Sequence, residues 1–146
     1  MRKVSDGLIG IMNTVKRYAI LFTIFIILYV IGSKCLEILE SVKIVPFEDI
    51  KVDFKENIVQ AIFSFLLTFL PLSVLFDFLP SQRLFIILKV ISLSCLGLFI
   101  GSYIYFITYP EWVEISGADV RKETAMIIFG IVGLIYSLVS SFIIKK

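Results

Sequence analysis

Residues 84–109 read LFIILKVISLSCLGLFIGSYIYFITY, and this stretch decides the fold class of the chain. It contains one charged side chain, Lys89, in a run that is otherwise apolar or uncharged. About 20 mostly apolar residues are enough for an α-helix to cross a bilayer. The apolar positions are continuous rather than alternating, which favours a helix over a barrel strand. Residues 84–109 are therefore predicted to form a membrane-spanning helix that is long enough to tilt.

The whole chain has the same character. Of its 146 residues, 59% are apolar and 18% are charged, whereas soluble domains usually hold about 45–50% apolar and about 25% charged residues. Three further apolar stretches lie at 18–34, 57–76 and 124–144. We predict an all-α membrane protein in which four transmembrane helices form one antiparallel bundle over residues 1–146. The external loops would be 35–56 and 110–123.

The Lys and Arg residues predict how the bundle is oriented, because short cytoplasmic loops are enriched in them. Eight lie in the N-terminal segment, near the turn before the third span and at the C-terminus, together with two acids. The segments 34–56 and 110–123 hold the other six, together with ten acids. We therefore expect a multi-pass inner-membrane protein with both termini in the cytoplasm.

Two segments outside the spans are open to more than one interpretation. Residues 1–17 are mildly amphipathic, which is typical of an interfacial helix on anionic lipid but also of a cytoplasmic lead-in to the first span. The loop 35–56 is either a recognition surface or an ordinary polar connection. Within this loop, alternating residues 50–54 suggest an extended segment, and Asp53 fits the N-cap of the second span.

Pro71 lies inside the second span. Proline removes a backbone hydrogen bond from a helix, and nearby Ser or Thr side chains can compensate for the loss in a membrane. Thr68 and Ser73 are close enough in sequence to do so. Pro71 therefore marks either a hinge or a static kink.

Lys89 is the ionisable residue placed within an apolar run. A charge inside a membrane is by default a functional hypothesis, and the best partner in the sequence is Asp77, from the same helical hairpin. The alternative is that the long side chain snorkels to the nearby cytoplasmic interface.

Small residues form stripes on the last two spans. Such residues allow helix backbones to approach closely. The stripes either join two subunits or pack the third span against the fourth within one chain. Their members are Ser94, Gly97 and Gly101 in the third span and Gly130, Gly133 and Ser137 in the fourth.

Chemistry-bearing residues are sparse. The chain has no His and two widely separated cysteines, Cys35 and Cys95. Their predicted depths do not favour a disulfide, and no carboxylate lies at the centre of a span, which argues against a proton-coupled carrier. We therefore expect a non-enzymatic protein with no cofactor or metal and no direct contact with nucleic acid.

In size, span number and inferred position of its termini, the chain resembles immunity proteins against pore-forming colicins and small membrane subunits of bacterial phage-defence systems. This resemblance implies a sensor, regulatory or protective membrane subunit. We expect it to act by protein–protein contact with a cytoplasmic or membrane partner, in the lipid bilayer and as a homo-oligomer. The alternative is an oligomeric ion channel or small-molecule carrier, with a polar lining from Ser64, Thr68, Ser92 and Ser94.

Overall fold

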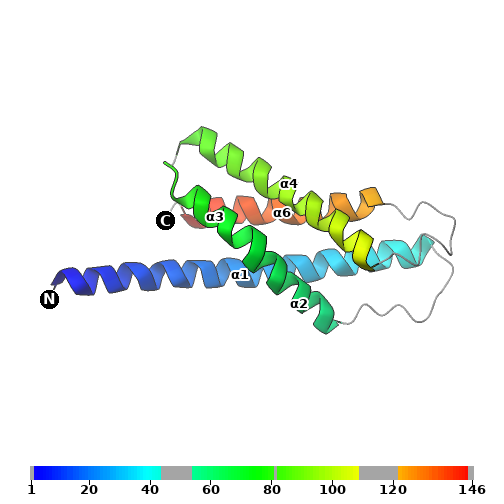
Figure 1. Ribbon diagram of the computed structural model, residues 1–146, viewed down its shortest axis with the longest axis horizontal. Coiled ribbons are helices and arrows are strands. Elements are labelled where there is room, and N and C mark those ends of the chain that lie inside the picture. Colours follow the sequence, from blue (N-terminus) through cyan, green and yellow to red (C-terminus); the bar gives the residue numbers. More distant parts are fainter. Residues whose placement is uncertain (1, 44–53, 81, 109–121, 145–146) are drawn as a thin grey trace.

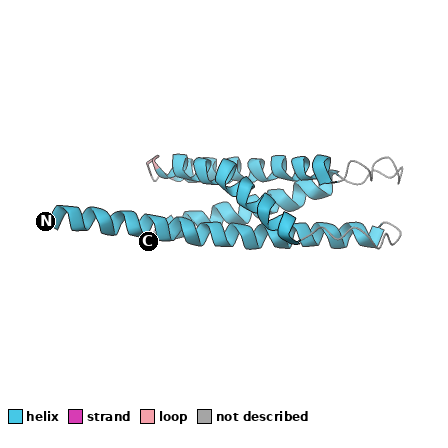
Figure 2. Cartoon of the chain, turned by 60° about the horizontal axis from the view of Figure 1, so that its bottom comes forward, coloured by secondary structure: helices cyan, strands magenta, loops and turns pink. Residues whose placement is uncertain are grey.

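The computed structural model describes residues 2–43, 54–80, 82–108 and 122–144, and every element in these ranges is helical (Figures 1 and 2). Four of these helical stretches are long and apolar enough to cross a membrane, which fits the predicted multi-pass, all-α membrane protein. They are Ile9–Leu36, Ile58–Asp77, Arg83–Phe106 and Lys122–Ile143. The elements are α1 (Arg2–Lys43), α2 (Phe54–Ser64), the π-helix η1 (Phe65–Phe69), α3 (Leu70–Asp77), α4 (Arg83–Thr108) and α6 (Lys122–Ile144).

Aromatic side chains fill the centre of the bundle. The ring of Phe25 in α1 lies 4.5 Å from that of Phe69 in η1 and 5.6 Å from that of Tyr136 in α6. Phe65 packs edge-on against Tyr136, and Tyr29 packs against Phe129 of α6. Such ring pairs contribute about 0.5–1.5 kcal/mol each beyond the area that they bury. The first, second and fourth spans therefore meet in a core of packed aromatic rings.

Although the first span is rich in bulky apolar side chains that would suit contact with lipid, one of its faces is buried in the bundle. Leu21, Phe25, Tyr29 and Leu36 are almost fully buried. They recur at helical spacing and form a stripe that faces the other helices. The span is apolar all round, so its composition did not distinguish the buried stripe from the lipid-facing one.

The second span is interrupted where Pro71 was expected to bend it. Pro71 is the second residue of α3, and α3 directly follows η1. At the junction, the backbone N–H of Leu70 donates to the carbonyl of Phe65, five residues back. Thr68 donates its hydroxyl to the Ser64 carbonyl, as expected for a compensating side chain, whereas Ser73 bonds to Tyr136 instead. The disturbance by proline thus takes the form of a π-helical turn.

Helix α1 is much longer than a span. Its 42 residues extend about 63 Å at 1.5 Å per residue, about twice the hydrocarbon thickness of a bilayer. The helix therefore continues beyond the predicted span end at residue 34 and into the predicted external loop, as far as Lys43. The N-terminal segment is a direct extension of α1, and it projects past the ends of the other helices (Figures 1 and 2).

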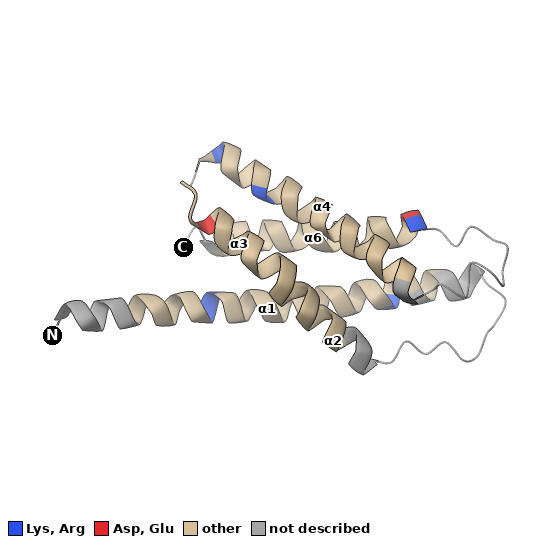
Figure 3. Ribbon diagram, in the orientation of Figure 1, with Lys and Arg blue, Asp and Glu red and all other residues tan. Residues whose placement is uncertain are grey.

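Charged side chains are few along the described helices, with long uncharged stretches between them (Figure 3). Several of the expected features lie outside the described residues. These are the Asp53 cap, most of the extended segment at 50–54 and the greater part of the second external loop at 110–123.

Candidate functional site

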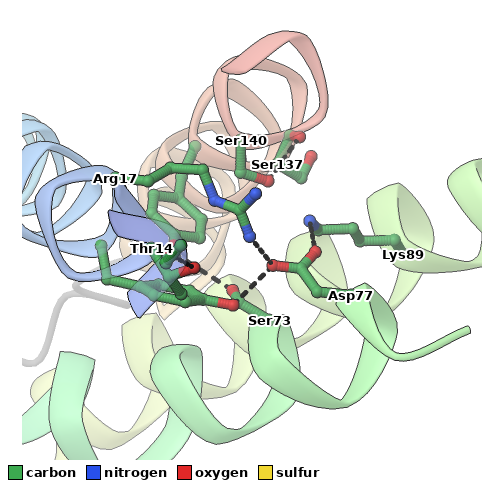
Figure 4. Close-up of polar contacts among 10 residues, drawn as sticks. Thr14, Arg17, Ser73, Asp77, Lys89, Ser137 and Ser140 are labelled. Carbon is green, nitrogen blue, oxygen red and sulfur yellow. Dashed lines mark hydrogen bonds and ion pairs between the residues drawn. The ribbon is translucent and has the colours of Figure 1, made fainter. Parts of the chain in front are cut away.

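A cluster of ionisable side chains surrounds Asp77 at the last residue of α3 (Figure 4). One carboxylate oxygen accepts a hydrogen bond from Nζ of Lys89 in α4 at 3.1 Å. The other accepts from the Arg17 guanidinium at 3.0 Å and from the Tyr18 hydroxyl at 2.5 Å, both in α1. The single carboxylate therefore connects three helices.

The pairing of Lys89 with Asp77 confirms the partner expected from the sequence. Lys89 is only 4% exposed, so the expectation that its side chain snorkels to the interface is not met. The Asp77 side chain is 12% exposed and that of Arg17 is 27% exposed. Removing ions from water costs several kcal/mol each, and only close partners offset this cost. The cluster therefore holds the helix ends in one arrangement.

The charges of the cluster do not balance. Two cations, Arg17 and Lys89, share the one carboxylate of Asp77. Nε of Arg17 is buried and has no hydrogen-bond partner, although the guanidinium also lies 5.3 Å from the centre of the Tyr18 ring. Asp77 is consequently the one counterion in this group, and each cation depends on it.

A second polar pair lies one helical turn before Asp77. The hydroxyls of Ser73 and Tyr136 are 3.1 Å apart, and both residues are completely buried. In α6, Ser137 and Ser140 are also buried, but their hydroxyls bond to the carbonyls of their own helix, those of Leu134 and Ser137. The Ser73–Tyr136 bond thus joins α3 to α6 and completes the connection of all four spans at this end.

Replacing Tyr136 with Phe keeps the ring packing and removes only the hydroxyl. We expect the free energy of unfolding to fall by about 1–2 kcal/mol, because the buried Ser73 hydroxyl loses its partner across the interface. The measurement is equilibrium unfolding in lipid bicelles. The double variant with Ser73→Ala should recover part of the loss, and equal stabilities of Tyr136→Phe and the wild type would contradict this assignment.

The stripes of small residues pack α4 against α6 within one chain. A Cβ atom added to Gly97 would overlap the carbonyl oxygen of Phe129, and one added to Gly101 would overlap that of Ala125. From the opposite side, a Cβ on Gly133 would overlap the carbonyl oxygen of Leu93 and approach the Cα of Ser94. Of the two interpretations of these stripes, the structure therefore shows the intramolecular one.

The polar residues proposed to line a pore belong to the second and third spans. Ser64 and Thr68 lie on neighbouring turns of the second span and bond to each other through hydroxyl and carbonyl. Ser94 of α4 bonds to the carbonyl of Val90 in its own helix. Both cysteines, Cys35 and Cys95, are free and exposed. Within the described ranges, no group of three His, Cys, Asp or Glu side chains is arranged to hold a metal ion.

Four of the partners in these clusters could not be predicted from the sequence: Arg17, Tyr18, Ser73 and Tyr136. Arg17 had counted only as one of the N-terminal cations, Ser73 had been expected to compensate for Pro71, and Tyr18 and Tyr136 look like ordinary residues of apolar helices. The one available signal was helical spacing, because Arg17 and Tyr18 lie one turn before Leu21 and Phe22. The chain matches no protein-family model, no curated protein and no solved structure.

Proposed function

We propose that the chain is a non-enzymatic subunit of the inner membrane that acts by contact with a cytoplasmic or membrane protein. Its four spans form an antiparallel bundle with both termini in the cytoplasm, and its role is that of a sensor, regulator or protective factor of the toxin-immunity or phage-defence kind. The proposal is supported chiefly by the N-terminal part of α1.

This part of α1 leaves the bundle at the Asp77 cluster. Arg17 and Tyr18 contact Asp77, whereas every described residue from 9 to 16 is exposed. Four of these exposed residues are large and apolar. They are Ile9, Ile11, Met12 and Val15. At about 1.5 Å per residue, residues 9–16 project about 12 Å beyond the cluster.

An exposed helix with apolar side chains on neighbouring turns is suited to bind in a hydrophobic groove of another protein. Ile11 and Val15 are four residues apart and lie on the same face. The Asp77 cluster supports the base of the helix, so a change in its position would be transmitted to α3 and α4. This coupling is the physical basis on which we propose a sensor or regulatory role.

The orientation is supported by the Lys and Arg distribution, because Arg17, Arg83 and Lys89 all belong to the end of the bundle at which the chain termini lie (Figure 1). A cysteine-accessibility assay on a Cys35→Ser, Cys95→Ser background tests it. A new cysteine at Met12 should react with an impermeant maleimide only after the cells are opened.

Photo-crosslinking in intact cells tests contact through the arm. A photoreactive residue at Ile11 should form a discrete crosslink to one protein, and the same residue at Ile127, which is exposed on α6, should crosslink mainly to lipid. The additional change Val15→Asp should abolish the protein crosslink without reducing the amount of inserted chain. Crosslinks from Ile11 to lipid alone would overturn the proposal.

The channel or carrier alternative is tested by flux through liposomes that contain the purified protein. We expect no flux, because aromatic rings fill the centre of the bundle and conduction would need several copies. Ion flux that is altered by Lys89→Met would replace the proposed function by the alternative. A homo-oligomer stays a proposal, and its contacts would have to lie outside the α4–α6 faces, which are occupied within the chain.

A further inference from the structure

A cavity of about 360 Å³ lies between α1, α2 and α4, beside the π-helix η1. This volume is at the lower end of the range of small-molecule sites. Its lining combines polar side chains from all three helices with apolar ones from the second span. The polar members are Tyr29, Gln60, Ser64 and Tyr103, and the apolar members include Phe63 and Leu67.

The cavity opens to the bilayer. Phe63, Leu67 and Tyr103 line it and are at the same time exposed on the surface of membrane-spanning helices. Lipid is therefore the solvent in contact with its mouth, and a ligand would enter sideways from the membrane.

Polarity changes with depth along this cavity. Gln60 lies two residues inside the span Ile58–Asp77, and Tyr103 lies three residues before the end of the span Arg83–Phe106. Both are thus within about 5 Å of the boundary of their spans. Leu67 lies seven residues beyond Gln60, about 10 Å deeper. Gln60 and Tyr103 therefore lie at the level of lipid ester carbonyls, and Leu67 lies at the level of acyl chains.

The side-chain amide of Gln60 uses only part of its hydrogen-bonding capacity with the described side chains. Its Oε1 accepts a long bond of 3.4 Å from the Tyr29 hydroxyl, and no described side chain accepts a bond from its Nε2 group. Tyr29 is itself only 1% exposed. An amide at the edge of the hydrocarbon region is costly unless a partner satisfies its donors.

We propose that this cavity binds a membrane glycerolipid. One acyl chain would lie along Phe63 and Leu67, and an ester carbonyl would accept a hydrogen bond from Nε2 of Gln60. The arrangement matches the polarity of the cavity to that of the lipid, with the acceptor at the interface and the hydrocarbon below it. The site lies at the end of the bundle away from Asp77 and does not depend on the proposed function of the N-terminal arm.

The test compares a diester phosphatidylcholine with the diether lipid of the same chain length, because the diether lacks the ester carbonyls. Native mass spectrometry of the purified full chain counts the lipids that remain bound as detergent increases. We expect one tightly bound diester lipid per chain and about tenfold weaker binding of the diether, the effect of losing one hydrogen bond. Equal retention of the two lipids would overturn the proposal.

Two variants separate the hydrogen bond from the shape of the cavity. Gln60→Leu should abolish the preference for the diester, because it removes the amide and keeps a similar volume. Leu67→Trp should reduce the retention of both lipids, whereas Ile131→Trp, an equivalent change at an exposed position of α6, should retain both as the wild type does. An unchanged preference in Gln60→Leu, or unchanged retention in Leu67→Trp, would count against the site.

Discussion

Replacing Asp77 with Asn is expected to lower the free energy of unfolding by about 3–5 kcal/mol, the usual cost of removing one member of a buried ion pair. Lys89 is 4% exposed, and both Lys89 and Arg17 have Asp77 as their ion-pair partner. An amide at position 77 accepts hydrogen bonds but carries no charge, so two cations are left to repel each other. Reversible unfolding in bicelles by steric trapping measures the loss.

Two further variants make this result specific. Glu123→Gln is the matched control, because it neutralises an exposed carboxylate at the beginning of α6, and we expect it to change stability by less than about 1 kcal/mol. The double variant Asp77→Asn, Lys89→Met should recover most of the loss, since the more deeply buried cation is then absent. If Asp77→Asn behaved like Glu123→Gln, the cluster would have no stabilising role.

Gly97→Ala is expected to destabilise the chain by about 2–3 kcal/mol, which is large for the addition of one methyl group. The new Cβ would overlap the carbonyl oxygen of Phe129, and its neighbours there are backbone atoms that no rotamer change can move. Helix α4 must therefore separate from α6. Gly97→Leu should prevent the close approach of these helices, which a pair of spin labels on their exposed faces would report as a longer distance.

The glycines of the chain supply graded controls for this prediction. Gly130→Ala should cost less than Gly97→Ala, because its Cβ would meet the end of the flexible Leu98 side chain at 2.6 Å. Gly10→Ala should be neutral or stabilise α1 by up to about 1 kcal/mol, because nothing lies within 4 Å of its Cβ. Equal effects of all three substitutions would show that helix propensity, rather than close packing, determines the result.

The stripes of small residues show which part of one helix interface can be predicted from the sequence. The spacing of Gly97 and Gly101 predicted that this face of the third span is buried, and the structure places it against α6. The spacing of these glycines did not indicate whether the facing helix belongs to the same chain or to another copy. Whether the partner helix is intramolecular depends on how closely α4 approaches α6, and only the folded structure shows this distance.

Only one of the contacts in the Asp77 cluster could be predicted from the sequence. The sequence marks Lys89 as a candidate because a charge is costly in an apolar run, and Asp77 is the acidic residue nearest to it along the chain. Arg17 and Tyr18 are about 60 residues from Asp77, and no local pattern connects positions so far apart. The same holds for Ser73 and Tyr136, which are 63 residues apart.

By itself, the sequence determined that the chain forms four helices that are long and apolar enough to cross a membrane. Hydropathy is a local property, and in hydrocarbon the backbone must satisfy its own hydrogen bonds, so a long apolar segment has almost no alternative to a helix. The tertiary structure decided which stripe of each helix is buried and which partners meet at Asp77. In spans that are apolar all round, every face is compatible with lipid, and only packing between segments distant in the chain distinguishes one face from another.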